Sequence, residues 1–272
     1  MVLDITDDFL RSRLANVQKS VVGERTLIQK LLPAISLRER WLEREFLPES
    51  MFHEEGIEPL LMDAVAYAAL YDAFPMLDVL LTPNGLATVG NSNLVPASEA
   101  RSREARKSLA TLLFMSLEAL LSELRRNDAW LKSSHANVFA RSLVVSLHDM
   151  CALDHDRTAD SFELAKTMQL KAAIAEDKLA ERYISRDLMV HLRRGNLAGS
   201  LSEDECHVVT RIRDAVSLMI EYKTISHGVI LEVVNYIRER PAVFPLWHSS
   251  RVALTFIDHR FKNERRSGGF FL

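Results

Sequence analysis

The sequence has little cysteine, glycine and proline, and each shortage excludes a class of protein. Only Cys151 and Cys206 occur among 272 residues, which excludes a small secreted domain held together by several disulfides. Nine glycines and eight prolines supply too few turns for a many-stranded sandwich or barrel. Hydrophobic residues make up 48% and charged residues 26%, as in an ordinary globular protein rather than a disordered one. A mainly helical fold is therefore expected.

The chain also lacks the marks of export, of a membrane span and of a nucleic-acid-binding protein. Residues 1–8 are acidic where a secretory signal is basic. The most apolar stretch, residues 60–74, contains Asp63 and Asp72 and is shorter than the roughly 20 residues that a bilayer span requires. A formal charge of −3 provides no broad basic surface. We expect a cytoplasmic protein with neither membrane nor nucleic acid as a partner.

Apolar residues recur at helical spacing along most of the chain. These patterns predict helices that begin near Leu27, Leu60, Ser98 and Ser161, the second of them apolar almost all round and therefore central to the core. Pro33 interrupts the first pattern, and Ser36 to Glu39 match a capping box, so a restart of the helix is favoured there. From residue 161 to about residue 194 we expect one helical stretch. A second capping box, Ser202 to Glu205, predicts another helix start.

One segment has the pattern of a β-hairpin. Two β-capable runs, residues 79–82 and 86–89, flank Pro83-Asn84-Gly85, and an Asn-Gly pair between such runs is a strong hairpin signal because both residues tolerate positive φ. A polar loop with Asn91 and Asn93 follows. We predict a hairpin inserted over about residues 76–98.

Three landmarks occur twice in the same order, which suggests an internal duplication. The run 41–47 is similar to the run 178–184. Asp63-Ala64-Val65, followed by Tyr71, is similar to Asp214-Ala215-Val216, followed by Tyr222. The segment 124–134, which contains Trp130, is similar to the segment 237–250, which contains Trp247. The predicted fold is an all-α helical bundle of two related units, residues 1–157 and 158–272, with the hairpin inserted in the first. Chance similarity between two amphipathic helical halves is the alternative.

Familiar catalytic motifs are missing from the sequence. It has no glycine-rich phosphate loop, no H-E-x-x-H and no G-x-S-x-G, so we expect no cofactor, no small-molecule substrate and no enzymatic activity. One arrangement offers an alternative. His148, Cys151 and His155 are spaced three and four residues apart and would share one face of a continuous helix, as the ligands of a metal-dependent enzyme or regulator would. Ordinary surface histidines explain the same spacing.

The last residues of the sequence combine a polar stretch with an apolar end. Residues 262–269 are polar and glycine-containing, and Phe270, Phe271 and Leu272 follow them. Exposed large apolar side chains favour association, so we expect these three residues to dock either on their own domain or on a neighbouring subunit.

Several segments resemble an uncharacterised family of Bacteroidales phage and prophage proteins. Residues 77–98, LDVLLTPNGLATVGNSNLVPAS, follow an alanine-rich helix and are similar to the family's centre. Residues 236–250, YIRERPAVFPLWHSS, and the final KNERRSGGFFL are similar to its later helix end and its C-terminus.

The resemblance implies a head–tail connector or adaptor, a structural protein whose helical subunits assemble as rings and carry no catalytic residues. The matched positions are Thr82, Asn84, Gly85, Asn91 and Asn93, and with residues 270–272 they are the expected contacts to a neighbouring subunit. A host-encoded helical scaffold protein is the alternative outside a phage.

Overall fold

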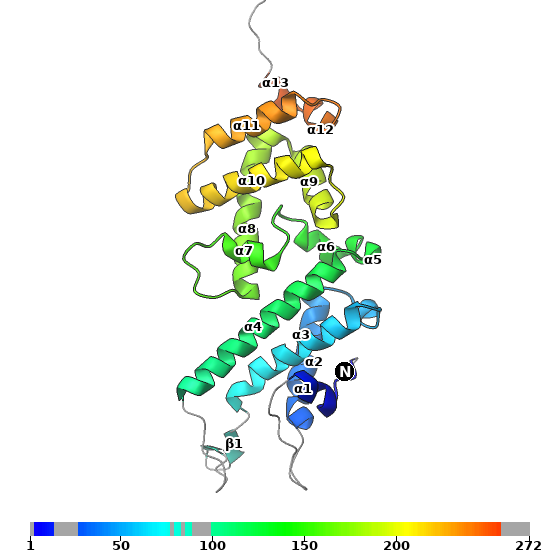
Figure 1. Ribbon diagram of the computed structural model, residues 1–272, viewed down its shortest axis with the longest axis vertical. Coiled ribbons are helices and arrows are strands. Elements are labelled where there is room, and N and C mark those ends of the chain that lie inside the picture. Colours follow the sequence, from blue (N-terminus) through cyan, green and yellow to red (C-terminus); the bar gives the residue numbers. More distant parts are fainter. Residues whose placement is uncertain (1–2, 14–26, 77–78, 83–84, 89–98, 257–272) are drawn as a thin grey trace, which may run out of the picture.

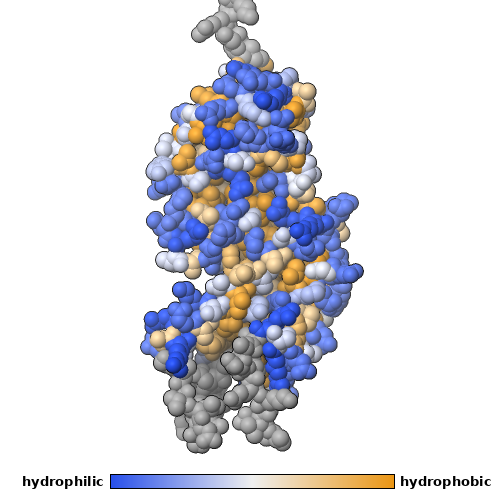
Figure 2. All heavy atoms as spheres, in the orientation of Figure 1, coloured by the Kyte–Doolittle hydropathy of each residue, from blue (hydrophilic) through white to orange (hydrophobic). Residues whose placement is uncertain are grey.

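The helices of the computed structural model follow one another along an elongated molecule (Figure 1). The structure describes residues 3–13, 27–76, 79–82, 85–88 and 99–256. In this view α1 to α4 lie in the lower part, α9 to α13 in the upper part, and α5, α6 and α7 at the middle. We call α1 to α6 the lower half of the molecule and α7 to α13 the upper half. One hydrophobic core of buried side chains extends through both halves. In the space-filling view, hydrophobic residues appear as patches among hydrophilic ones (Figure 2).

The lower half is built around α3, as its apolar sequence predicts. Its elements are α1 (Asp7–Arg13), α2 (Leu27–Glu45), the short 3-10 helix η1 (Glu49–Met51), α3 (Ile57–Ala73), the 3-10 turn η2 (Phe74–Met76), α4 (Glu99–Leu124), α5 (Asp128–Leu131) and α6 (Ser134–Phe139). Helix α3 packs against both α2 and α4. Four of its alanines are buried, and their small side chains allow the neighbouring backbones to approach closely.

The upper half, like the lower one, ends in two short helices that follow longer ones. Its elements are α7 (Leu147–Ala152), α8 (Phe162–Leu179), the π-helical turn η3 (Ala180–Ile184), α9 (Arg186–Ala198), α10 (Glu203–Tyr222), α11 (His227–Arg238), α12 (Pro245–His248) and α13 (Arg251–Leu254). The capping box at the start of α10 is confirmed: the Ser202 side chain accepts from Glu205 N–H, and the Glu205 carboxylate accepts from Ser202 N–H. Within the described residues, no helix is both long and apolar enough to cross a membrane.

The predicted restart of a helix at Ser36 is wrong, because α2 continues through Pro33 without a break. Proline removes one backbone hydrogen bond, but Pro33 lies on the exposed side of the helix. The buried side chains of Leu31, Ile35 and Leu42 lie on the other side and hold both parts of the helix against the core. Burial of this continuous apolar face outweighs the local cost of the proline.

The predicted helical stretch from residue 161 to about residue 194 is interrupted by a turn. Helix α8 widens into the turn η3, and Ser185 then adopts a φ of 75° before α9 begins. The Ser185 side chain accepts from Leu188 N–H and caps α9. The widened turn and the cap together change the direction of the chain. Neither alters the spacing of the apolar residues, so the sequence pattern did not predict the break.

Two short strands lie between α3 and α4. Strand β1 (Val79–Thr82) pairs antiparallel with β2 (Gly85–Thr88), with Thr82 opposite Gly85. The remaining elements are helical in the part of the chain that the structure describes. The strand pair thus occupies the segment with the Asn-Gly pattern.

Two buried tryptophans close the two halves of the molecule. The Trp130 indole N–H donates to the carbonyl oxygen of Phe46 at 2.6 Å, just after the end of α2. The Trp247 indole N–H donates to the carbonyl oxygen of Tyr183 at 2.8 Å, within the turn that ends α8. The bond to Phe46 is buried and the bond to Tyr183 is part-buried, and a carbonyl that folding removes from water needs such a donor.

Replacement of either tryptophan tests these bonds. Trp130→Phe and Trp247→Phe each leave a carbonyl without its indole donor and lose ring volume, so each should lower the free energy of unfolding by about 1–3 kcal/mol. Urea denaturation measures both values. Leu254→Ala, at an exposed position of α13, is the control and should change stability by less than about 0.5 kcal/mol. An effect of either tryptophan variant no larger than the control would contradict the assignment.

Candidate interaction site

Helix α8 joins the two halves of the molecule through its first turn. The buried Phe162 ring packs edge-on against Trp41, with centroids 5.1 Å apart and an interplanar angle of 83°. It also contacts Phe46 at 5.1 Å. Edge-to-face aromatic contacts add about 0.5–1.5 kcal/mol to the area that they bury. The start of α8 is therefore held in an aromatic groove along α2.

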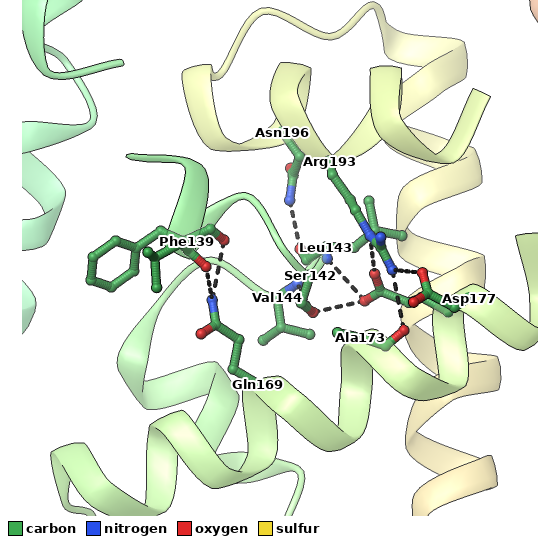
Figure 3. A network of polar contacts seen from close by, with 11 residues as sticks. Phe139, Ser142, Leu143, Val144, Gln169, Ala173, Asp177, Arg193 and Asn196 are labelled. Carbon is green, nitrogen blue, oxygen red and sulfur yellow. Dashed lines mark hydrogen bonds and ion pairs between the residues drawn. The ribbon is translucent and has the colours of Figure 1, made fainter. Parts of the chain in front are cut away.

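Polar contacts surround this aromatic centre. Lys166 of α8 pairs with Glu45 at 2.6 Å. The Gln169 amide donates to the carbonyl oxygens of Val138 and Phe139, both at 3.2 Å (Figure 3). These bonds fix the rotation of α8 relative to the end of α6.

Arg125, just after α4, makes a second link between the halves. Its guanidinium donates to the carbonyl oxygens of Leu197 and Asn196, at 3.0 and 3.1 Å. Burial lowers the pKa of Arg125, and the nearby carboxylates of Glu118 and Asp149 oppose that shift. The cation thus binds carbonyls in the last turn of α9, where a positive charge is favourable.

Truncation of Phe162 should uncouple the two halves. Phe162→Ala removes the ring that α2 surrounds and should lower the free energy of unfolding by about 3–5 kcal/mol. Scanning calorimetry should then show two separated transitions where the unaltered chain shows one. Leu170→Ala, on an exposed position of the same helix, is the matched control and should leave the profile unchanged. A single transition shifted no further than that of the control would contradict the coupling.

Further along α8, the buried carboxylate of Glu176 is bound by residues 142–143 and by Arg193 (Figure 3). Glu176 Oε1 accepts from the Ser142 hydroxyl at 2.7 Å and from Leu143 N–H at 2.9 Å, and Oε2 accepts from Arg193 Nε at 2.7 Å. Burial raises the pKa of Glu176, and the charge and hydrogen bonds of Arg193 act in the opposite direction. All these bonds join the carboxylate to groups of the chain itself, so Glu176 fixes residues 142–143 on α8.

Glu39 in the lower half is the other buried glutamate with such a bond. Its Oε1 accepts from Leu3 N–H at 2.9 Å, which anchors the segment before α1 on α2. Each glutamate therefore fixes a distant stretch of backbone on a long helix.

Removal of Arg193 should expose the cost of burying Glu176. Without that cation the pKa of Glu176 in the folded chain rises further, while the unfolded chain keeps an ordinary value near 4.3. The folded state then binds more protons than the unfolded state in the range above that value, so stability falls as the pH rises. Arg193→Met should be destabilised by about 3 kcal/mol at pH 7.5 and by clearly less at pH 5.

Denaturation at the two pH values measures this difference. Arg186→Met, which removes an exposed partner of Glu181, is the control and should change stability by less than about 1 kcal/mol at both pH values. An equal loss for Arg193→Met at both pH values would show that Glu176 does not need its cation.

The predicted metal-binding residues are not brought together. Helix α7 ends at Ala152, before His155. His148 Nδ1 lies 3.1 Å from Asp160, His155 Nε2 lies 3.6 Å from Glu221, and the Cys151 thiol is buried and donates to the carbonyl of Ser161 at 3.4 Å. Burial also raises the pKa of Cys151, which favours the neutral thiol over the thiolate that binds metals. Among the described residues, no three His, Cys, Asp or Glu side chains are placed to hold a metal ion.

The predicted contact residues are only partly described. Thr82 and Gly85 are paired at the ends of the two strands. Asn84, Asn91, Asn93, Phe270, Phe271 and Leu272 lie outside the described residues. Their expected role in subunit contacts stays a prediction.

The described surface also carries two large open grooves. One, of 610 Å³, lies between α8 and the end of α10 and is lined by Lys171, Ile174, Ala175, Lys178, Glu181, Arg182, Met219, Ile220, Lys223, Thr224 and Ile225. The other, of 690 Å³, lies along α4 and reaches His148 and Asp160. The first has an apolar floor and a mainly basic rim.

The roles of Glu39, Glu176 and Arg125 in binding distant backbone were not predicted from the sequence. A signal for the two glutamates was present, because each lies three residues before a leucine of the matched runs, Leu42 or Leu179. Arg125 gave none, since its acceptors are backbone oxygens more than 70 residues away.

Comparison with known proteins finds a similarity for only part of the chain. Residues 19–140 match the model of a family described as a family of unknown function (DUF6712). No curated protein and no solved structure matches the chain. The similarity to that family therefore covers α2 to α6 and stops before α7.

Proposed function

We propose that the protein is a structural, non-enzymatic subunit that acts through protein–protein contacts and is built from two copies of one helical module. In this proposal residues 3–139 form the first module and residues 143–256 the second. The resemblance to phage and prophage proteins suggests a head–tail connector or adaptor as its setting. Support comes from interactions that recur at matching positions of the two halves.

The aromatic clusters carry the argument for duplication. Trp130 donates to the carbonyl of Phe46, and its ring lies 5.8 Å from Phe139, whose ring lies 5.5 Å from that of Phe46.

In the second half Trp247 donates to the carbonyl of Tyr183, and Phe256 lies 6.2 Å from both rings. Tyr183 is the residue that the similarity between runs 41–47 and 178–184 places opposite Phe46. In both halves the phenylalanine follows the tryptophan by nine positions.

The helix that follows each tryptophan begins in the same way. Ser133 and Ser250 lie three residues after Trp130 and Trp247, and their hydroxyls accept from the N–H groups of Ala136 and Ala253 at 3.2 Å. The tryptophan, the serine cap and the alanine whose N–H is capped have the same spacing in both halves, which is difficult to explain by amphipathic pattern alone.

The two buried glutamates define where each module begins. Glu39 accepts from Leu3 N–H and Glu176 from Leu143 N–H, at 2.9 Å in both cases. Three residues after each leucine, Thr6 and Ser146 cap α1 and α7. We therefore propose that the second module begins near residue 143, in place of the predicted 158, and includes α7, which packs on α8. The family match, which ends at residue 140, supports this boundary.

The central and following helices have matching burial. The fully buried positions Leu61, Ala64 and Val65 of α3 correspond to Ile212, Ala215 and Val216 of α10. Along α4 and α11, the buried positions pair as Leu117 with Ile230, Leu120 with Val233, Leu121 with Val234 and Leu124 with Ile237. The strand pair between α3 and α4 corresponds to residues 223–226 between α10 and α11, so the hairpin is the insertion in the first module.

A structural role follows from how these modules are joined. The start of one module's long helix docks into the groove of the other, as in repeat proteins whose units bury their apolar faces on their neighbours. The pKa values of the buried Glu176 and the half-buried Arg125 are shifted, and both side chains bind backbone of their own chain. The proposed activity is therefore assembly.

Self-association tests the proposal. Mass photometry and analytical ultracentrifugation over a rising concentration series should give discrete oligomers with masses that are multiples of 30.9 kDa. Addition of salt separates charge-driven from apolar association. A folded chain that stays monomeric at every concentration would contradict a self-assembling role.

A further inference from the structure

The 610 Å³ groove between α8 and the end of α10 lies where the first module has an ion pair. In the first module the Arg38 guanidinium binds the Asp72 carboxylate through two bonds of 2.6 Å and so joins α2 to α3. The matched runs place Ala175 and Lys223 at these two positions, and both line the groove. The second module thus lacks the pair that joins the long helices of the first, and the groove is open there.

The rim of this groove is basic, and its charges are not neutralised within the described part of the chain. Its one carboxylate, Glu181, already pairs with Arg186 at 2.6 Å. Four cations surround it, and none of them forms an ion pair with a described residue: Lys171, Lys178, Arg182 and Lys223. Their counterparts in the first module include no cation: Ala34, Trp41, Glu45 and Asp72. The basic rim is therefore specific to the second module and favours an anionic partner.

The floor of the groove is apolar. Ile174 is 51% exposed, and Met219, Ile220 and Ile225 extend the apolar surface around it. An apolar floor with a charged rim is typical of protein–protein contacts, in which the rim selects the partner by charge. None of the residues that line the groove is aromatic, so nucleic-acid bases would find no ring to stack on. The surface therefore favours a protein as the anionic partner.

The start of α8 shows what kind of segment binds at this position. Residues 160–163, Asp-Ser-Phe-Glu, lie against Arg38 and Trp41 around a narrow pocket of the first module. The counterparts of these two residues, Ala175 and Lys178, line the open groove. The bound segment is a helix start that carries the buried Phe162 between two carboxylates. An apolar anchor with acidic neighbours on a helix thus fits the first module, and the more basic groove calls for more negative charge.

We propose that the groove between α8 and α10 binds an acidic amphipathic helix of a partner protein. Apolar side chains one turn apart on that helix pack on Ile174 and Met219, as in other complexes of a helix with a groove. Carboxylates beside them pair with Lys178, Arg182 and Lys223. This inference rests on the proposed role in protein–protein contacts and names the chemistry of one partner.

A peptide derived from the chain itself serves as the probe. It has the sequence of residues 160–171 with Lys166→Glu and Lys171→Glu, so two new carboxylates join Asp160 and Glu163, and it carries a fluorescent label. Fluorescence anisotropy with the full chain should show saturable binding that weakens as salt is added. The unaltered sequence, which keeps both lysines, is the control peptide and should bind at least about tenfold more weakly. No saturable binding of the acidic peptide up to about 1 mM chain, or equal binding of both peptides, would overturn the proposal.

Charge reversal on the rim tests where the peptide binds. The double variant Lys178→Glu, Arg182→Glu should weaken binding at least about tenfold, because two attractive contacts become repulsive. Lys132→Glu, Arg194→Glu makes the same change of net charge at exposed positions outside the groove and should stay within about twofold of the unaltered chain. Circular dichroism checks that both variants are folded. An equal loss for both would show that net charge alone attracts the peptide, against the proposal.

A second variant closes the groove without adding net negative charge to its rim alone. Ala175→Arg with Lys223→Asp introduces the ion pair that Arg38 and Asp72 form in the first module. It should abolish peptide binding while the melting temperature stays at or above that of the unaltered chain. A folded double variant that binds the peptide as before would place the peptide elsewhere and overturn the proposal.

Two further results distinguish the possible failures. A single-stranded oligonucleotide that displaces the peptide at lower concentrations than unlabelled peptide does would assign the groove to nucleic acid and overturn this inference. A chain that stays monomeric but binds the peptide in the groove would contradict self-assembly and support the inference. Oligomers of a chain that does not bind the peptide would do the reverse.

Discussion

The buried indole N–H that donates to a carbonyl at the end of a long helix determines how each half of this protein is closed. Such a carbonyl cannot be left without a donor, because its lost hydration would cost several kilocalories per mole. Trp130 and Trp247 each meet this need from a short helix far along the chain, at 2.6 and 2.8 Å. The bond brings the end of each half back onto its long helix, and the aromatic cluster and the following capped helix depend on that return.

Much of the helical fold could be predicted from local patterns, because helix starts and apolar stripes are local properties. The core helix α3 and the capping box of α10 follow from their own residues. The continuous path of α2 through Pro33 depends instead on tertiary packing of Ile35 and Leu42, and the turn at Ser185 on a cap and a positive φ. Neither feature alters the spacing of apolar residues, so the sequence pattern could not reveal them.

The interaction site was less accessible to sequence reasoning, because its parts come from distant segments. The spacing of His148, Cys151 and His155 suggested a shared helical face only under the assumption that one helix contains all three, and α7 ends before the third. The docking of Phe162 on Trp41 and the bonds of Arg125 to α9 join residues separated by more than 70 positions. The repeated landmarks were the one long-range signal in the sequence, and they point to the pair of buried glutamates that anchor Leu3 and Leu143.

Exchange of the indole protons tests the equivalence of the two halves most directly. The chain has three tryptophans, so a nitrogen-15-labelled sample gives three indole N–H signals. We expect the indole protons of Trp130 and Trp247 to exchange with solvent slowly and at similar rates, set by opening of the folded chain, and that of the half-buried Trp41 to exchange faster. Rapid exchange of either Trp130 or Trp247, at the rate of Trp41, would contradict the claim that the same buried bond closes both halves.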